Sequence, residues 1–244
     1  MDIIIGTRGS SLALAQTRRV SQMLKNLDVN TTLKVIKTSG DSFTDRPLHE
    51  LGGVGAFVRE IDERMLSGEI DIAVHSMKDL PTERPDELPT AAVLKRDSPY
   101  DALLTRDGST LDELPEGAVI GTTSLRRKSQ VLRYRPDFDV QSLRGNIDTR
   151  IKKLESRKFD GIILAEAGLK RMGWDLPVHQ LDIDNFCPSA NQGAIAVVAK
   201  SGDESEDIVS QINHPQTKTE TEIERIVIGN VGGGCIVPIG AYAE

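Results

Sequence analysis

The chain has 244 residues, 38% of them hydrophobic and 27% charged, and its formal net charge is −7. This acidic balance argues against a general nucleic-acid-binding protein, and no apolar run approaches the roughly 18 residues that a membrane-spanning helix needs. With no basic leader and only two cysteines, we expect a cytoplasmic protein without a structural disulfide. The four histidines show no metal-ligand spacing, so we expect no metal site.

Short β-rich runs alternate with helical patterns along the chain, as in a mostly parallel sheet covered by helices. In the first part we expect strands at 3–5, 32–36, 70–74 and 90–94, and helices at 10–27 and 56–67. A second set begins near Asp97, with expected strands at 100–105, 118–121, 138–143, 161–165 and 193–199, and expected helices at 125–135, 149–156, 204–212 and 220–231. The two sets show a similar alternation of strands and helices, so the sequence predicts an α/β fold with two lobes and a cleft.

Basic residues gather at four predicted strand-to-helix junctions. They are Arg8, Lys78, the pair Arg126 and Arg127, and the pair Arg144 and Arg150. An arginine in a first helical turn opposes the helix dipole, whereas a bound anion there would be held by free N–H and guanidinium groups together. Since loops that follow parallel strands lie at one edge of the sheet, where ligands bind, the pattern favours an anion-binding cleft. The alternative is that these arginines are solvated surface residues.

Small and hydroxylated residues accompany the basic ones. Gly9 leaves room for a close backbone approach, and hydroxyls occur at Thr7, Ser10, Thr122, Thr123 and Ser124. Ser10 and Ser124 are also well placed to cap the helices that follow them, and the two roles are compatible.

One carboxylate, Asp79, stands among these junctions, directly after Lys78. In a cationic cleft it should stay ionised, and it could stabilise a developing cation or accept an N–H hydrogen bond. The alternative is that Asp79 only forms the turn before Leu80 and Pro81.

Seven motifs occur in order along the chain: TRGSSLALAQ, DIAVHSMKDLPT, GTTSLRRKSQ, SLRGNIDTR, ILAEAGLKRMG, NQGAIAV and GGGCIVPIGAYAE. Together they resemble the porphobilinogen deaminase (hydroxymethylbilane synthase) family over almost all of the chain. The resemblance implies a transferase of tetrapyrrole (heme) biosynthesis that condenses four porphobilinogen molecules head to tail into hydroxymethylbilane, with release of ammonia. It also implies a dipyrromethane cofactor bound by a thioether to Cys235, whose neighbouring glycines would let the loop move the attached pyrroles.

The implied fold has two periplasmic-binding-protein-like (type II) lobes with a cleft, plus a small α+β C-terminal domain that is truncated here. We expect residues 1–94 plus 191–213 to form lobe 1 with the catalytic aspartate, and 95–190 to form lobe 2 with the arginine-rich anion site. Residues 214–244 are expected to be the remnant of the cofactor-anchoring domain.

The resemblance also assigns roles to individual residues. It makes Asp79 the catalytic carboxylate and matches six arginines to the carboxylate-binding arginines of the family: Arg8, Arg126, Arg127, Arg144, Arg150 and Arg171. Further cofactor or substrate contacts are expected at Ser10, Gln16, Phe57, Ser76, Lys78, Thr122, Ser124 and Gln192. In the glycine loop many relatives have a lysine where this chain has Val54, so one carboxylate contact is missing.

The competing hypothesis is a non-enzymatic, two-lobed protein that binds or senses a carboxylate or oxyanion. It would use the same arginines and leave Cys235 incidental. The competing interpretations of Cys235 itself are a buried small hydrophobe or a catalytic thiol. We expect a monomer, and we expect Cys187 to be a packed small residue.

Overall fold

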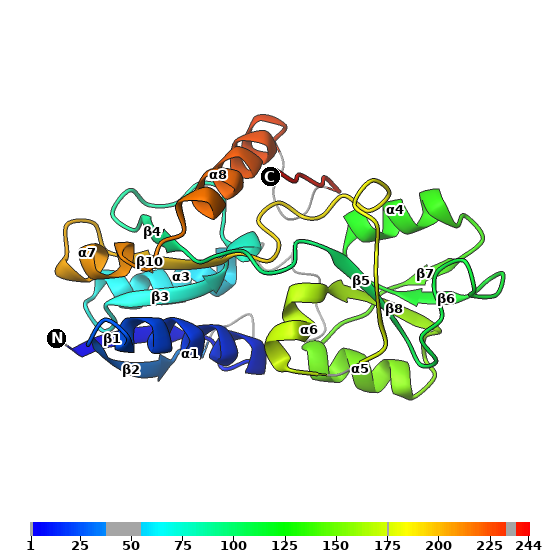
Figure 1. The fold of residues 1–244 in the computed structure, drawn as a ribbon, viewed down its shortest axis with the longest axis horizontal. Helices are drawn as coiled ribbons and strands as arrows, with labels where there is room; N and C mark the ends of the chain where they lie inside the picture. Colours follow the sequence, from blue (N-terminus) through cyan, green and yellow to red (C-terminus); the bar gives the residue numbers. More distant parts are fainter. Residues whose placement is uncertain (1, 38–54, 175, 233–237) are drawn as a thin grey trace.

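The computed structural model describes residues 2–37, 55–174, 176–232 and 238–244, without the side chains of 55–57. Cys235 and Val54 therefore lie outside the described residues, as does the side chain of Phe57. Two five-stranded sheets lie side by side in the molecule (Figure 1).

The first sheet contains the first four strands of the chain and the last one. In sheet order they are β2 (Asn30–Val35), β1 (Asp2–Thr7), β3 (Ile72–Ser76), β10 (Ile195–Ala199) and β4 (Thr90–Val93). β1 is parallel to β2 and β3, and β10 is antiparallel to both of its neighbours. The sheet is thus mixed: the predicted parallel pairing holds for β2, β1 and β3, whereas β10 runs against both of its neighbours.

The second sheet repeats this arrangement. In sheet order its strands are β7 (Asp139–Gln141), β6 (Val119–Gly121), β8 (Gly161–Ala165), β5 (Asp101–Thr105) and β9 (Val178–Gln180). β6 is parallel to β7 and β8, whereas β5 is antiparallel to β8 and β9. β9 was not predicted from the sequence, because three residues with one apolar member give no strand pattern.

Two crossover segments connect the sheets, 94–100 before β5 and 181–194 before β10 (Figure 1). Because β5 and β10 are antiparallel, each begins at the edge where its parallel neighbours end: Asp101 pairs with Ala165, and Ile195 pairs with Ser76. The crossovers meet where the Asp97 N–H donates to the Gly193 carbonyl at 3.1 Å. Both crossovers therefore reach the edge at which the basic junctions lie.

Seven helices are described: α1 (Ser11–Lys25), α3 (Gly55–Leu66), α4 (Leu125–Tyr134), α5 (Ile147–Glu155), α6 (Glu166–Met172), α7 (Glu204–Ser210) and α8 (Pro215–Asn230). None of the helices in these ranges is long and apolar enough to cross a membrane. α6 was not predicted, and α8 begins earlier than expected because Pro215 fits the first helical turn. Lys78 follows a strand as predicted, but it lies in a single 3₁₀ turn, Met77–Asp79, rather than in an α-helix.

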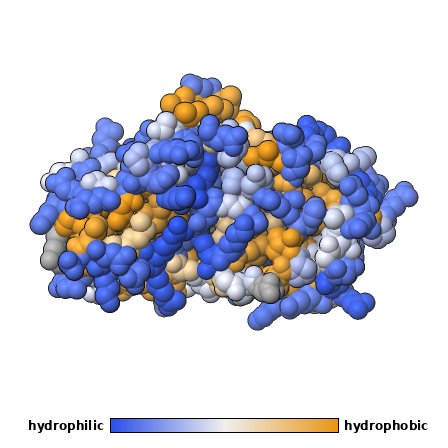
Figure 2. All heavy atoms as spheres, in the orientation of Figure 1, coloured by the Kyte–Doolittle hydropathy of each residue, from blue (hydrophilic) through white to orange (hydrophobic). Residues whose placement is uncertain are grey.

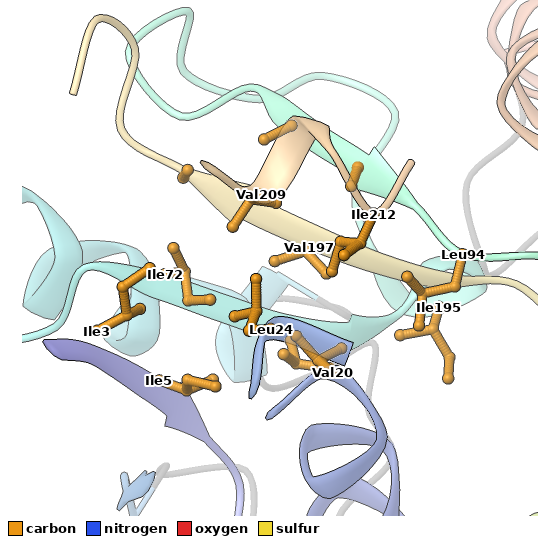
Figure 3. Close-up of a cluster of buried hydrophobic side chains, with 14 of the residues drawn as sticks. Ile3, Ile5, Val20, Leu24, Ile72, Leu94, Ile195, Val197, Val209 and Ile212 are labelled. Atoms are coloured by element: carbon orange, nitrogen blue, oxygen red, sulfur yellow. The ribbon is translucent and has the colours of Figure 1, made fainter. Parts of the chain in front are cut away.

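The alternation of side chains along the strands gives the first sheet two apolar faces. On one face Ile3 and Ile5 pack with Val20 and Leu24 of α1 and with Val209 of α7 (Figure 3). On the other face a second cluster joins the sheet to α3, through Val58, Ile61 and Met65. The sheet is thus covered on both sides, which fixes the positions of its strand ends.

α8 buries mainly polar side chains, unlike an ordinary amphipathic helix, which buries its apolar face. Its buried side chains include the polar residues Thr217, Thr221 and Glu224, whereas Ile223 and Ile226 are 48% and 61% exposed. Figure 2 shows the resulting apolar surface at the top of the molecule. α8 is therefore held to the rest of the protein largely by hydrogen bonds and ion pairs.

The close packing of the crossovers predicts a specific sensitivity at Gly193. This residue has a φ of +87°, and a Cβ there would lie 2.5 Å from the Ser98 carbonyl oxygen, a backbone atom that cannot rotate away. Gly202 is the matched control, since its φ is +79° but a Cβ would meet nothing within 4 Å. We expect Gly202→Ala to lower the free energy of unfolding by about 1 kcal/mol through backbone strain, and Gly193→Ala by about 1–3 kcal/mol more through overpacking. Urea denaturation measures both, and equal losses would contradict the packing argument.

Candidate functional site

Charged side chains from both sheets meet at the edge where the crossovers arrive. Lys78 and Asp79 follow β3, Arg126 and Arg127 lie in the first turn of α4, Arg150 lies in α5, and Asp101 begins β5. We call these six residues the charged cluster. In Figure 2 hydrophilic residues gather in a band between the two halves of the molecule.

Asp101 is the buried centre of the charged cluster. Its side chain is fully buried, and its Oδ1 accepts from Arg127 Nε and Nη2 at 3.0 and 2.8 Å. Arg126 Nη1 lies 2.8 Å from Oδ2. Burial alone would raise the pKa of Asp101, but the charges of Arg127 and Arg126 outweigh it and hold the pKa well below its usual range. The sequence analysis missed this residue, whose signal was a carboxylate at the start of an otherwise apolar strand.

The two arginines are fixed by further contacts. Arg127 Nη1 donates to the Ile163 carbonyl at 3.0 Å, and Arg126 Nη1 donates to the Cys187 carbonyl at 2.6 Å and to Gln130 Oε1 at 3.0 Å. Arg126 and Arg127 are 5% and 7% exposed, and burial together with the charge of Arg127 lowers the pKa of Arg126 against the pull of Asp101. They are preorganised groups on α4 rather than solvated surface arginines, so that alternative is wrong for this pair.

Gln192 joins the charged cluster across the two sheets. It is fully buried, and its Nε2 donates to the Pro99 carbonyl and to Asp101 Oδ1 at 2.8 and 2.9 Å. These donations fix the direction of the amide, so its Oε1 faces Arg127 Nη2 at 3.3 Å and Lys78 Nζ at 3.4 Å. The neutral oxygen thus lies between one cation from each sheet.

Lys78 and Arg150 are two cations whose pKa values are lowered by burial. Burial, together with the charges of Arg127 and Arg126, lowers the pKa of Lys78 to about 8, although Asp79 and Asp101 oppose the shift. Burial and Arg127 lower the pKa of Arg150 to about 10, against the charge of Asp79. Asp79 itself is exposed. Lys78 and the three arginines outnumber Asp79 and Asp101, so the charged cluster has an excess of positive charge.

Chemically, such a cluster suits a ligand with several carboxylates. A bound carboxylate would favour the charged forms of Lys78 and Arg150 and so reverse the cost of their burial. Asp79, exposed beside these cations, is the group available to a cationic or N–H-donating part of the same ligand.

The predicted hydroxyl and amide residues lie at the strand ends. Ser10 Oγ accepts from the Ala13 N–H at 3.3 Å, and Ser124 Oγ accepts from the Arg127 N–H at 3.4 Å, so their predicted capping role is confirmed. Thr122 Oγ1 accepts from the Ser124 N–H at 3.2 Å.

Gln16 and Ser76 form a direct contact between α1 and the end of β3. Gln16 Nε2 donates to Ser76 Oγ at 2.8 Å. This bond places both side chains at the end of the strand that precedes Lys78 and Asp79.

Arg171 lies in a separate group with two residues that the sequence analysis did not single out. Arg171 Nε donates to Asp97 Oδ2 at 2.7 Å, and Arg19 Nη1 donates to Asp97 Oδ1 at 2.8 Å. Together with Gln16 and Lys170, this group lines a cavity of about 360 Å³. Asp97 thus connects α1 of the first sheet with α6 of the second.

The two remaining arginines lie outside the charged cluster. Arg8 is half-buried and lies near His75. Burial lowers the pKa of His75 to about 3, and the positive charges of Arg84 and Arg8 add to this shift. Arg144 is half-buried on the loop after β7, and its carbonyl accepts from Lys153 Nζ at 3.0 Å.

Comparison with known sequences gives consistent matches. The family model "Porphobilinogen deaminase, dipyromethane cofactor binding domain" matches residues 3–207. A probable porphobilinogen deaminase of Methanococcoides burtonii is 64% identical over 242 residues, which cover 99% of this chain and 78% of that protein. The porphobilinogen deaminase of Desulforamulus reducens is 49% identical over 99% of this chain and 80% of its own length.

Comparison with solved structures concerns the fold alone. An ancestral cationic amino acid solute binding protein covers 93% of this chain, and 94% of its own length is matched, with a TM-score of 0.54 at 12% identity. The second substrate binding domain of Lactococcus lactis GlnP, in its open conformation, has a TM-score of 0.51 at 11% identity and covers 95% of this chain with 90% of its own length. The predicted two-lobed, periplasmic-binding-protein-like α/β fold is confirmed.

The lowered pKa of Lys78 gives a direct test of the charged cluster. We expect competitive acetylation of Lys78, followed by mass spectrometry, to give a midpoint near pH 8 in the folded protein. In the unfolded chain, which serves as the control, the midpoint should return to about 10.4. Because a bound carboxylate favours the ammonium form, a polycarboxylate ligand should raise the midpoint, and its affinity should fall as the pH rises above 8. A midpoint near 10 in the folded protein would contradict this description.

Proposed function

Because the chain belongs to the porphobilinogen deaminase family, we propose that it condenses four porphobilinogen molecules head to tail into hydroxymethylbilane and releases ammonia at each step. The observation that supports this most strongly is the excess of positive charge that both sheets place around the exposed carboxylate of Asp79. Every pyrrole ring of the substrate has an acetate and a propionate, so the growing chain is a polyanion.

The residues of the charged cluster fit the dipyrromethane cofactor that the family model names. Its two rings have several carboxylates, and the half-buried cations Lys78 and Arg150, whose pKa values are lowered, are suited to bind them. Arg126 and Arg127 would contribute from their fixed positions on Asp101, and Cys235 would form the thioether. When bound, the dipyrromethane supplies the nucleophilic pyrrole carbon that starts the chain and stays on the protein when product leaves.

Asp79 is proposed as the catalytic carboxylate. When ammonia leaves porphobilinogen, positive charge develops on the pyrrole, and a fixed carboxylate stabilises this charge and accepts the ring N–H hydrogen bond. Lys78 Nζ donates to Gln192 Oε1. In this proposal Lys78 binds the substrate carboxylates and does not contact the reacting carbon. Binding of the substrate carboxylates by the cations and stabilisation of charge by Asp79 are thus separate tasks of neighbouring residues.

Other parts of the proposal rest on the family resemblance. They include the remaining predicted contacts, namely Arg8, Ser10, Gln16, Phe57, Ser76, Thr122, Ser124, Arg144, Arg171 and Gln192. They also include a monomeric, cytoplasmic protein with lobe 1 at 1–94 plus 191–213, lobe 2 at 95–190 and a cofactor-anchoring remnant at 214–244.

Intact mass tests the cofactor. After incubation with porphobilinogen, we expect the wild-type chain to have a covalent excess of two linked pyrroles and to turn pink with an aldehyde reagent for pyrroles. Cys235→Ser should lose both signals, whereas Cys187→Ser, the matched control at the other cysteine, should keep them. A wild-type chain that stays at its bare sequence mass with porphobilinogen would favour the non-enzymatic binding protein.

Substitution of Asp79 tests the catalytic assignment. We expect Asp79→Asn to keep the covalent cofactor but to lower the rate of ammonia release by about 10²–10³-fold, because a neutral amide stabilises the developing cation poorly. Asp86→Asn removes an exposed carboxylate from the loop that follows, and we expect it to leave turnover within twofold of wild type. Normal turnover in Asp79→Asn would refute the assignment.

A further inference from the structure

The backbone on both sides of Asp79 is held by distant parts of the chain. Asp79 ends the 3₁₀ turn Met77–Asp79. Before it, the Met77 N–H donates to the Ala194 carbonyl at 3.0 Å, in the crossover that leads to β10. After it, Leu80 is buried and its N–H donates to the Met77 carbonyl at 3.1 Å. The turn therefore depends on what holds the next residues, 80–82.

A single side chain, Arg225 of α8, contacts those three residues. Its Nη1 donates to the Leu80 carbonyl at 3.4 Å, and its Nη2 donates to the Thr82 carbonyl at 2.9 Å and also to the Pro81 carbonyl. Three consecutive carbonyls thus converge on one guanidinium, whose planar fork of donors suits such an arrangement. A lysine in the same place would have one point charge instead of this fork.

The residue before Arg225 fixes α8 itself. Glu224 is 1% exposed and accepts from Arg96 Nη2 at 2.8 and 2.7 Å, from the Asn191 N–H at 2.6 Å and from the Ala243 N–H at 2.9 Å. Consecutive residues of α8 therefore bind the crossover and the turn that contains Asp79. α8 ends at Asn230, shortly before Cys235 in the sequence.

We infer that Arg225 is a positioning residue for the reaction: it sets the place of the Asp79 carboxylate by holding the carbonyls of residues 80–82, and it ties that turn to the helix that leads to Cys235. The inference rests on the proposed function. It assigns Arg225 no contact with substrate or cofactor. Its effect passes through the backbone of Asp79.

Amide hydrogen exchange tests the structural step without any need for activity. In full-length Arg225→Met, we expect exchange in the peptide that contains 77–82 to be at least about 10-fold faster than in wild type, since its carbonyl anchor is gone. Arg225→Lys should give an intermediate rate. Lys218→Met, which removes a cation from the same helix, should leave the peptide unchanged. Unchanged exchange in Arg225→Met would overturn the inference.

Kinetics then separate positioning from general destabilisation. We expect Arg225→Met to keep the covalent cofactor by mass and to lower kcat about 10–100-fold, with KM for porphobilinogen within about threefold, because a small displacement of a catalytic group has effects of this size. Arg225→Lys should recover part of kcat. If Arg225→Met folds poorly, Arg225→Lys, which keeps the charge, provides the same comparison.

A double-substitution cycle identifies Asp79 as the group affected. In an Asp79→Glu background, where the carboxylate is already displaced, we expect Arg225→Met to lower the residual rate by less than about twofold. An equal fold-loss in both backgrounds would show a merely structural role and overturn the inference. If wild type itself releases no ammonia, the proposed function fails, and hydrogen exchange alone decides the role of Arg225.

Discussion

The buried ion pairs of Asp101 make the cationic site possible. Arg126 and Arg127 are adjacent and almost fully buried, and without a counter-charge each would cost several kcal/mol to desolvate while repelling the other. The Asp101 carboxylate contacts both guanidinium groups and has no exposure to water. The acidic residue at the start of β5 thus makes it possible to bury two adjacent arginines at the start of α4.

Among the residues that the structure describes, Asp101 and Asp79 offset only part of the positive charge of the charged cluster, which suits a site for an anion. Asp101 compensates one of the two arginines, and the exposed Asp79 is the other carboxylate of the charged cluster. The lowered pKa values of Lys78 and Arg150 show that burial and the neighbouring cations disfavour the charged forms of both side chains. A second buried carboxylate would stabilise the free protein but compete with the ligand, whereas the observed balance leaves that stabilisation for a polyanion to supply.

Local patterns in the sequence predicted those features that depend on neighbouring residues. The strand at 3–5 and the helix that begins at residue 125 can each be predicted from fewer than a dozen neighbouring residues, and the structure contains both elements. The partner of Arg127 could not be found in this way, because Asp101 precedes it by 26 positions and only the sheet brings them together. The early start of α8 was missed because its buried face is polar, so hydrophobic periodicity underestimates it.

The segments that connect the two sheets also supply residues of the charged cluster and its contacts. β5 and β10 are antiparallel, so the crossovers end beside the carboxyl ends of the parallel strands and place Asp101 and Gln192 there. Gln192 contacts Lys78 of one sheet and Arg127 of the other through a single oxygen. Both contacts depend on the observed arrangement of the two sheets. The distance between Lys78 and Arg127 therefore depends on the relative placement of the sheets.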